Sequence, residues 1–446
     1  MLEDRQEYLH LSRIYIRYDC GQPEEVKNRV NSLIISGGTP LVGEVKIAGA
    51  KNAALAIIAA ALLTDAPVII DNVPNISDVN VMLDIVKNLG VEADWCEKNT
   101  IRIHVPGDIG YQTPYELVKK LRASNLLLGP LLARQGRVEI SLPGGCNIGS
   151  RPMDLHFKGL AGMGAEIELE HGVIKGKCDR LEGAKIYLDF PSVGATENIM
   201  MAAVLAKGQT VIENVAKEPE IVDLANFLNS MGAKVRGAGT DVIRIDGVER
   251  LRGGRYSVIP DRIEAGTFMV AAVATDGDLL IDGVITTHIE PLIAKLREAG
   301  AEIREEDEKV RVRRRSKLRP IDIKTLPYPG FPTDMQSQMM AMLTTVKGTS
   351  VIVENIFENR LQVADEFKRM GAKIKVEGRT AIIQGVEKLQ GAKVKASDLR
   401  AGAALIIAGL MAEGETEICN THYIERGYEG IYDKLNALGV KTAIKY

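Results

Sequence analysis

The strongest constraint on the fold of this 446-residue chain is an internal repeat. A helix-like segment that stops at a glycine recurs six times, at Gly90, Gly164, Gly232, Gly300, Gly371 and Gly439. Successive glycines lie 74, 68, 68, 71 and 68 residues apart. A glycine that precedes an alternating apolar stretch, as in "MGAEIE", predicts a left-handed helix end leading into a strand. Solenoid repeats run to roughly 20–45 residues, so the longer unit favours two globular α/β domains of three units each.

Each unit also contains a helix rich in small residues, and the starts of these helices carry polar residues. They read "GAKNAA", "LRASN", "PSVGATEN", "PDRIEAG", "PTDMQS" and "SDLRAG". Ser, Thr and Asp at these places are explained as N-caps. Lys51, Arg122 and Arg400 are not, because a cation opposes the positive end of the helix dipole. A bound anion would explain them. The sequence therefore predicts a cleft that binds ligands with one or more phosphate groups. The cations that line this cleft should repel one another until anions fill it.

Composition and charge argue against several classes of protein. A net charge of −3 provides no basic field for nucleic acid or a membrane surface. The one dense basic run, "RVRRRSKLRP" at 311–320, alternates as a solvated edge strand would. The longest apolar runs are too short to span a bilayer. Five scattered cysteines and no secretory signal in the first residues predict reduced thiols and a cytoplasmic location. The six histidines do not cluster, so we expect no metal site.

One cysteine lies in an unusual place. The stretch "LPGGCNIGSRPMDLH" surrounds Cys146 with glycines, which predicts an exposed thiol on a flexible loop. His156 follows ten residues later, and a Cys-His hydrolase is one interpretation. We disfavour it because no orienting third residue or family signature accompanies the pair.

This loop occurs together with "GAKNAA", "LRAS", "PSVGATENIMMAA", "FPTDMQSQ", "FENR", "SDLRA" and "RGYE". From about residue 34 to 446 the chain resembles the UDP-N-acetylglucosamine 1-carboxyvinyltransferase family. The resemblance implies an α/β fold of two inverse α/β barrel-like domains, each of three repeated units, with the active site in the interdomain cleft. It implies a first domain at 51–259, a second domain at 34–50 and 260–446, and an amino-terminal extension at 1–33.

The resemblance also implies an activity. Members transfer the enolpyruvyl group of phosphoenolpyruvate to the 3-hydroxyl of UDP-N-acetylglucosamine and release phosphate, the committed step of peptidoglycan synthesis. Both substrates are small molecules, no cofactor is needed, and we expect a monomer. Cys146 matches the family's proton donor, and Asp334 matches the carboxylate that faces the sugar hydroxyl, which makes it the candidate base.

The same matching gives two sets of binding residues. Those for phosphoenolpyruvate are Lys51, Asn52, Arg122, Arg151, Arg360, Arg400 and Arg426. Those for UDP-N-acetylglucosamine are Asn52, Arg122, Arg151, Pro152, Met153, Asp154, Leu155, Ser192, Val193, Gly194, Asp334 and Ile356. The chain departs from the pattern at Phe190, where some members carry a lysine. The rival interpretations are enolpyruvyl transfer to a shikimate phosphate, a catalytically silent nucleotide-sugar binding protein and, more weakly, a repeat scaffold.

Overall fold

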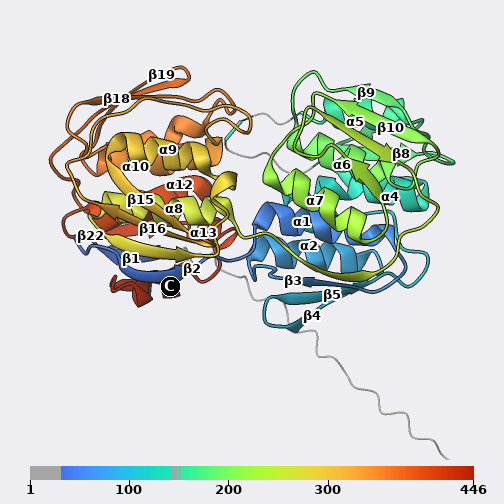
Figure 1. Cartoon of the computed structure of the whole chain (residues 1–446), viewed down its shortest axis with the longest axis horizontal. Coiled ribbons are helices and arrows are strands. Elements are labelled where there is room, and N and C mark those ends of the chain that lie inside the picture. Colours follow the sequence, from blue (N-terminus) through green and yellow to red (C-terminus); the bar gives the residue numbers. More distant parts are fainter. Residues whose placement is uncertain (1–31, 143–147, 150–151, 446) are drawn as a thin grey trace, which may run out of the picture.

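The chain folds into two lobes that lie side by side (Figure 1). The computed structural model describes residues 32–142, 148–149 and 152–445, so most of the extension, Cys146 and Arg151 lie outside the described residues. The core of the first lobe draws its residues from 50–258. The core of the second lobe draws on 33–47 and on 263–440. The beginning of the described chain therefore completes the lobe that also contains its end.

The strands of the first lobe form three sheets. Their bounds are Val68–Asp71 (β3), Glu92–Glu97 (β4), Thr100–His104 (β5), Arg137–Ser141 (β6), Glu166–Glu170 (β7), Val173–Lys177 (β8), Lys185–Tyr187 (β9), Gln209–Glu213 (β10), Lys234–Arg236 (β11), Val242–Asp246 (β12) and Gly254–Ser257 (β13). The strand orders are β13–β3–β5–β4, β6–β8–β7 and β11–β12–β10–β9. In the two four-stranded sheets, one edge strand pairs in parallel while the other pairings are antiparallel.

The second lobe repeats this plan three times. Its strands are Ser32–Ser36 (β1), Val42–Lys46 (β2), Asp278–Asp282 (β14), Ala301–Glu306 (β15), Lys309–Arg314 (β16), Ile323–Lys324 (β17), Thr349–Val353 (β18), Lys373–Glu377 (β19), Thr380–Gln384 (β20), Lys393–Lys395 (β21), Glu415–Cys419 (β22) and Thr442–Lys445 (β23). The orders are β15–β16–β14–β2, β17–β18–β20–β19 and β21–β22–β1–β23. Six sheets in the described chain thus correspond to the six predicted units.

Helices fill the space between the sheets. The α-helices of the first lobe are Lys51–Ala60 (α1), Ser77–Asn88 (α2), Tyr115–Val118 (α3), Leu128–Gln135 (α4), Asp154–Gly162 (α5), Val193–Ala203 (α6) and Pro219–Ser230 (α7). Those of the second are Arg262–Ala274 (α8), Glu290–Ala299 (α9), Gln336–Leu343 (α10), Val363–Arg369 (α11), Leu399–Met411 (α12), His422–Glu425 (α13) and Ile431–Ala437 (α14). The 3₁₀ helices are Ala61–Leu63 (η1), Arg122–Leu127 (η2), Thr286–His288 (η3), Thr333–Met335 (η4) and Arg360–Gln362 (η5).

The inner helices are buried on all sides, as their small side chains allow. In α12 every residue from Arg400 to Leu410 is buried, and α10 is buried along its whole length. Helices α8, α10 and α12 lie inside the second lobe, with strands toward the outside (Figure 1). None of the described helices is long and apolar enough to cross a membrane.

The predicted helix stops are confirmed. All six stop glycines have φ between 87° and 110°, the left-handed region that glycine adopts without a steric penalty. The predicted α/β fold with two sets of three units is confirmed as well. The sheets remain open in the described parts of the chain, so "barrel-like" describes separate sheets around a helical interior and not a closed barrel.

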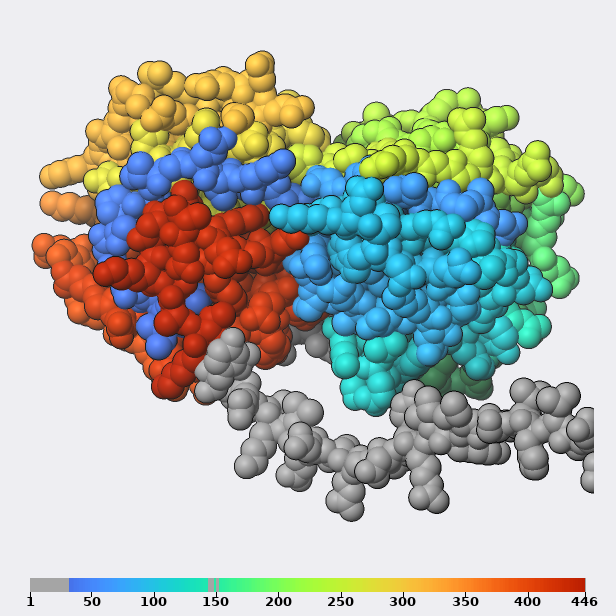
Figure 2. Space-filling view, turned by 90° about the horizontal axis from the view of Figure 1, so that it is seen from below, coloured from blue at the N-terminus to red at the C-terminus, as the bar shows by residue number. Residues whose placement is uncertain are grey.

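Two crossing segments join the lobes. The backbone N–H of Ala50 donates to the carbonyl of Ile259 at 2.8 Å, and that of Asp261 donates to the carbonyl of Ala48 at 2.9 Å. Beyond the crossing, β2 pairs in parallel with β14 of the second lobe, whereas β13 pairs in parallel with β3 of the first. Seen from below, the beginning of the described chain lies against its carboxyl-terminal residues in one lobe (Figure 2).

The interpretation of the basic run as an edge strand was wrong. Strand β16 contains the start of the run and lies between β15 and β14. Its arginines are neutralised by neighbours on those strands: the Nε of Arg311 donates to Asp278 at 2.7 Å, and the Nη2 of Arg313 donates to Glu302 at 2.9 Å. Alternation predicts the solvated face of a strand, but it does not give the strand's position in the sheet.

A glycine in α4 provides a test of the helical interior. A Cβ on Gly129 would lie 2.3 Å from the backbone oxygen of Asn198 in α6, so the two helices approach closely at this point. We expect Gly129→Ala to lower the free energy of unfolding by about 1–3 kcal/mol, the usual cost of overpacking. Gly254→Ala is the matched control, since its Cβ would meet nothing within 4 Å. Urea unfolding should separate the two variants, and equal midpoints would contradict the close packing.

Candidate active site

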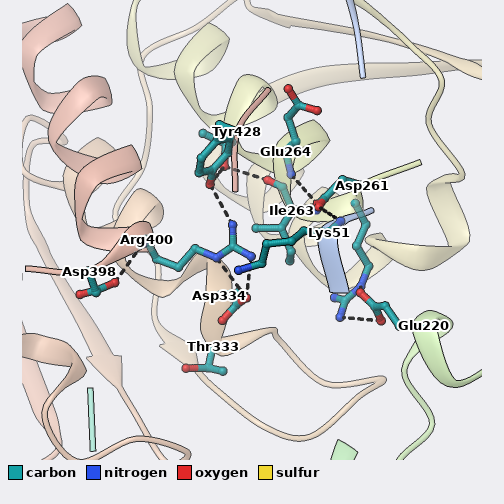
Figure 3. A network of polar contacts seen from close by, with 12 residues as sticks. Lys51, Glu220, Asp261, Ile263, Glu264, Thr333, Asp334, Asp398, Arg400 and Tyr428 are labelled. Atoms are coloured by element: carbon teal, nitrogen blue, oxygen red, sulfur yellow. Dashed lines mark hydrogen bonds and ion pairs between the residues drawn. The ribbon is translucent and has the colours of Figure 1, made fainter. Parts of the chain in front are cut away.

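Cations from both lobes gather at helix starts. Lys51 is the first residue of α1, Arg360 is the first residue of η5, and Arg400 is the second residue of α12. Arg426 directly follows α13. In Figure 3 the side chain of Lys51 lies beside the guanidinium of Arg400, although Lys51 belongs to the other lobe. Four of the predicted phosphoenolpyruvate ligands thus come from the two sides of the junction between the lobes.

Asp334 in η4 accepts bonds from two buried arginines. The Nη2 of Arg360 lies 2.8 Å from Oδ1, while the Nη2 and Nε of Arg400 lie 2.8 Å and 3.1 Å from Oδ2. Both arginines are only 4% exposed. Burial alone would raise the pKa of Asp334, but the attraction of Arg400 and Arg360 is stronger and holds that pKa well below its usual range. The carboxylate is therefore charged at neutral pH.

Asp78 forms a second pairing, this time across the lobes. It lies in the first turn of α2 and is 3% exposed. Its Oδ2 is 3.2 Å from the Nζ of Lys51, and its Oδ1 accepts a bond from the Nε of Arg426 at 2.7 Å. The sequence analysis did not identify Asp78, because an acidic residue in the first turn is a common helix-start feature.

These pairings correct one expectation. The cations were predicted to repel one another until a ligand arrives, but Lys51, Arg360, Arg400 and Arg426 each lie within 3.2 Å of a carboxylate oxygen. The protein itself supplies the anions that an empty cleft would otherwise lack. A ligand with carboxylate and phosphate groups would have to compete with these carboxylates or share their cations.

The fully buried carboxylate of Glu354 organises the segment that leads to Arg360. Its Oε1 accepts bonds from the backbone N–H groups of Ile356 at 2.8 Å and Phe357 at 3.1 Å. Its Oε2 accepts a bond from the hydroxyl of Thr333 at 2.9 Å, and that hydroxyl accepts a bond from Arg360 at 2.8 Å. One side chain thus fixes the backbone at Ile356 relative to η4. Nothing near Glu354 in the sequence indicates this role, since a glutamate directly after a strand is ordinary.

The predicted sugar-nucleotide residues gather at two helix starts of the first lobe. Ser192 caps α6, its Oγ accepting a bond from the N–H of Ala195 at 3.4 Å, and Val193 and Gly194 begin that helix. A Cβ on Gly194 would lie 3.0 Å from the Nε2 of His156 in α5, so the starts of α5 and α6 are adjacent.

The remaining predicted residues of this group are arranged as follows. Met153 is buried and Leu155 is partly buried, whereas Pro152 and Asp154 are exposed. Asn52 is exposed at the second position of α1. Arg122 begins η2 and is close enough to His156 to lower its pKa. Phe190, at the departing position, is 50% exposed.

Two further contacts join the lobes near these residues. The Nε of Arg262 at the start of α8 donates to Glu220 of α7 at 3.1 Å; Glu220 is buried, and the side chain of Arg262 is 11% exposed. The backbone N–H of Asn359 donates to the carbonyl of Ile148 at 3.0 Å. The short described segment 148–149 of the cysteine loop therefore contacts the segment that precedes Arg360 in the second lobe.

His156 is 4% exposed, and neither ring nitrogen has a hydrogen-bond partner among the described residues. Burial and, to a lesser extent, the nearby Arg122 lower its pKa to about 4. The ring is therefore neutral at physiological pH, and no described carboxylate orients it as a catalytic base would require. This arrangement gives no support to the Cys-His hydrolase interpretation.

The pKa of His156 predicts a pH dependence of stability. As the pH falls from about 6.5 to about 4, the unfolded chain binds a proton at this position that the folded chain does not. The free energy of unfolding should therefore decrease across this window, and His156→Gln should remove that part of the decrease. The midpoints of urea unfolding at pH 7 and pH 5 measure this loss of stability in the wild type and in His156→Gln. The difference between the two proteins reports His156 alone, because every other titratable group is present in both. An equal loss in the two proteins would contradict the prediction.

Comparison with known proteins places the chain in a family. Residues 35–435 match the family profile of EPSP synthase (3-phosphoshikimate 1-carboxyvinyltransferase). UDP-N-acetylglucosamine 1-carboxyvinyltransferase 2 of Carboxydothermus hydrogenoformans is 59% identical and covers 92% of this chain and 99% of its own. UDP-N-acetylglucosamine 1-carboxyvinyltransferase 1 of Caldanaerobacter subterraneus subsp. tengcongensis is 58% identical and covers 92% and 98%. The enolpyruvyl transferase NikO of Streptomyces tendae has the same fold, with a TM-score of 0.84, 24% identity and coverage of 93% and 99%. The chain is a transferase that belongs to the EPSP synthase family and, within it, to the UDP-N-acetylglucosamine 1-carboxyvinyltransferases.

Proposed function

We propose that the protein transfers the enolpyruvyl group of phosphoenolpyruvate to the 3-hydroxyl of UDP-N-acetylglucosamine and releases phosphate, the committed step of peptidoglycan synthesis. The observation that supports it best is the set of four cations at the junction of the lobes, where Arg360 and Arg400 pair with Asp334 and Lys51 and Arg426 pair with Asp78. A small ligand with one carboxylate and one phosphate group suits four cations, three of which lie at helix starts. Relatives at 59% and 58% identity over nearly the whole chain carry the name of this activity.

The chemistry needs one acid and one base. The sugar hydroxyl adds to the second carbon of phosphoenolpyruvate while the methylene carbon takes up a proton. Loss of a proton from the resulting methyl group then expels phosphate and restores the double bond. Cys146, which lies outside the described residues, is the proposed acid, since a thiol with a reference pKa of about 8.5 still holds its proton at neutral pH. Asp334 is the proposed base for the hydroxyl proton.

The two substrates would occupy different parts of the junction. Lys51, Arg122, Arg360, Arg400 and Arg426 would hold the carboxylate and phosphate of phosphoenolpyruvate. The starts of α5 and α6, with Leu155, Val193 and Gly194, and the backbone at Ile356 would hold the sugar nucleotide. Asn52, Arg122 and Arg151 would contribute to both sites, although Arg151 lies outside the described residues.

The remaining proposals concern the chain as a whole. The two separate cores support a first domain at 51–259 and a second domain at 34–50 and 260–446, with 1–33 as an extension. We propose that the enzyme works as a monomer in the cytoplasm and that it needs no cofactor.

The test of the activity is phosphate release from phosphoenolpyruvate. Phosphate should appear only when UDP-N-acetylglucosamine is added, and mass spectrometry should show an acceptor heavier by one enolpyruvyl group. Release with shikimate 3-phosphate instead would assign the other acceptor of the family. No release with either acceptor would refute enolpyruvyl transfer and favour a binding protein.

The role of Asp334 has its own test. Asp334→Asn keeps the shape of the side chain but cannot take the hydroxyl proton, so turnover should fall about 10²–10⁴-fold. Binding of UDP-N-acetylglucosamine, measured by calorimetry, should persist. Asp365→Asn in α11 is the matched control, since it changes an exposed aspartate whose ion pair with Lys368 lies on the surface. Near-normal turnover of Asp334→Asn would remove this residue from the base role.

A further inference from the structure

Asp78 lies outside every residue set assigned above, yet it contacts two of the proposed phosphoenolpyruvate ligands. It is held in α2 of the first lobe and is almost fully buried. One carboxylate oxygen faces Lys51 of the same lobe at 3.2 Å, and the other accepts a bond from Arg426 of the second lobe at 2.7 Å. The two cations come from segments far apart in the sequence, and Asp78 fixes the distance between them.

The surroundings of Lys51 are otherwise dominated by cations. Arg400 of α12 and Arg426 both face it. Among the carboxylates, Asp261 accepts a bond from its backbone N–H at 3.1 Å, whereas Asp334 is itself bound to Arg400. Burial is the largest influence and lowers the pKa of Lys51, the two arginines lower it further, and Asp78 opposes them. Removal of this carboxylate would leave a buried amine among positive charges.

We propose that Asp78 is a positioning residue for phosphoenolpyruvate: its carboxylate holds the ammonium of Lys51 and the guanidinium of Arg426 facing one anion site from opposite lobes. This inference rests on the proposed function. In the empty protein Asp78 is the counter-ion of both cations. When the substrate binds, Lys51 and Arg426 would contact both Asp78 and the new anion, so the cations need not be rebuilt for each turnover. Asp78 itself does not touch the substrate.

A purely structural role for Asp78 as a latch between the lobes predicts something different. Another contact already joins the lobes next to α2, since Oε1 of Glu429 accepts bonds from the N–H of Asn75 at 3.2 Å and from the side chain of Asn99 at 2.7 Å. Together with the pair of Arg262 and Glu220, this contact remains when Asp78 is changed. The lobes should therefore stay together in Asp78→Asn, and its effect should concern charge.

The experiment measures initial rates of phosphate release for Asp78→Asn across a pH series. The Michaelis constant for phosphoenolpyruvate should rise on the order of tenfold or more, because two charge-assisted bonds that orient its ligands are weakened. The constant for UDP-N-acetylglucosamine should change little. The alkaline limb of kcat/KM for phosphoenolpyruvate should move to lower pH, because Lys51 loses the carboxylate that raises its pKa. Asp84→Asn, an exposed position of the same helix, is the matched control.

A second readout does not depend on turnover. Trace labelling with acetic anhydride, followed by peptide mapping, reports at which pH Lys51 loses its proton. This pH should be lower in Asp78→Asn than in the wild type, whether or not the protein releases phosphate. A wild type that labels as expected but transfers nothing would refute the proposed function and leave the charge role of Asp78 supported.

Other outcomes would overturn the inference. An unchanged labelling profile together with equal changes in both Michaelis constants would reduce Asp78 to a structural residue. If Asp78→Asn does not fold, Asp78→Glu takes its place. It keeps the charge but displaces it, so the alkaline limb should stay in position while the constant for phosphoenolpyruvate alone rises. Equal changes for both substrates in that variant would equally refute the positioning role.

Discussion

The structure depends on ion pairs where the lobes meet, and each of these pairs has at least one buried member. Removal of a charge from water costs several kcal/mol, and the interior tolerates it only beside an opposite charge with good geometry. Asp334 meets this condition for Arg360 and Arg400, and Asp78 meets it for Lys51 and Arg426. Loss of the partner would leave the buried member of the pair as an uncompensated charge. The helix starts that carry the cations must therefore be placed accurately, and the fold provides this accuracy.

One carboxylate shows how the fold places them. Oδ1 of Asp261 caps α8 by accepting bonds from the N–H groups of Ile263 and Glu264, and Oδ2 accepts a bond from the N–H of Lys51 at 3.1 Å (Figure 3). Helix starts of both lobes are thus tied to one side chain. It lies in the same crossing where 48–50 pairs with 259–261. The chain passes between the lobes at the place where the helix that carries Lys51 begins. The relative position of the lobes and the geometry of the candidate site therefore have a common origin.

Local features of the fold could be predicted, whereas contacts between distant segments could not. The stop glycines and the caps Ser192, Asp261 and Asp398 follow from the backbone conformation at one position, which a short window of sequence contains. Asp78 is 348 residues away from Arg426, and nothing near either residue announces the other. The sequence therefore indicated where cations lie but not that the protein neutralises them. The error about the basic run has the same cause, because strand order in a sheet is a long-range property.

The counter-ions also bear on how a strongly acidic aspartate could act as a base. In the empty protein the pKa of Asp334 is held well below its usual range by Arg400 and Arg360, which makes it a poor proton acceptor. Under the proposed function, the carboxylate and phosphate of phosphoenolpyruvate bind beside the same arginines and offset part of their charge. The pKa of Asp334 then rises, and its basicity increases only when the second substrate is in place. Asp78 faces no acceptor hydroxyl in this scheme and acts only through Lys51 and Arg426. The two carboxylates thus take different roles, although both share their cations with the substrate. Asp334 lies next to the reacting hydroxyl in this scheme, whereas Asp78 lies between Lys51 of one lobe and Arg426 of the other.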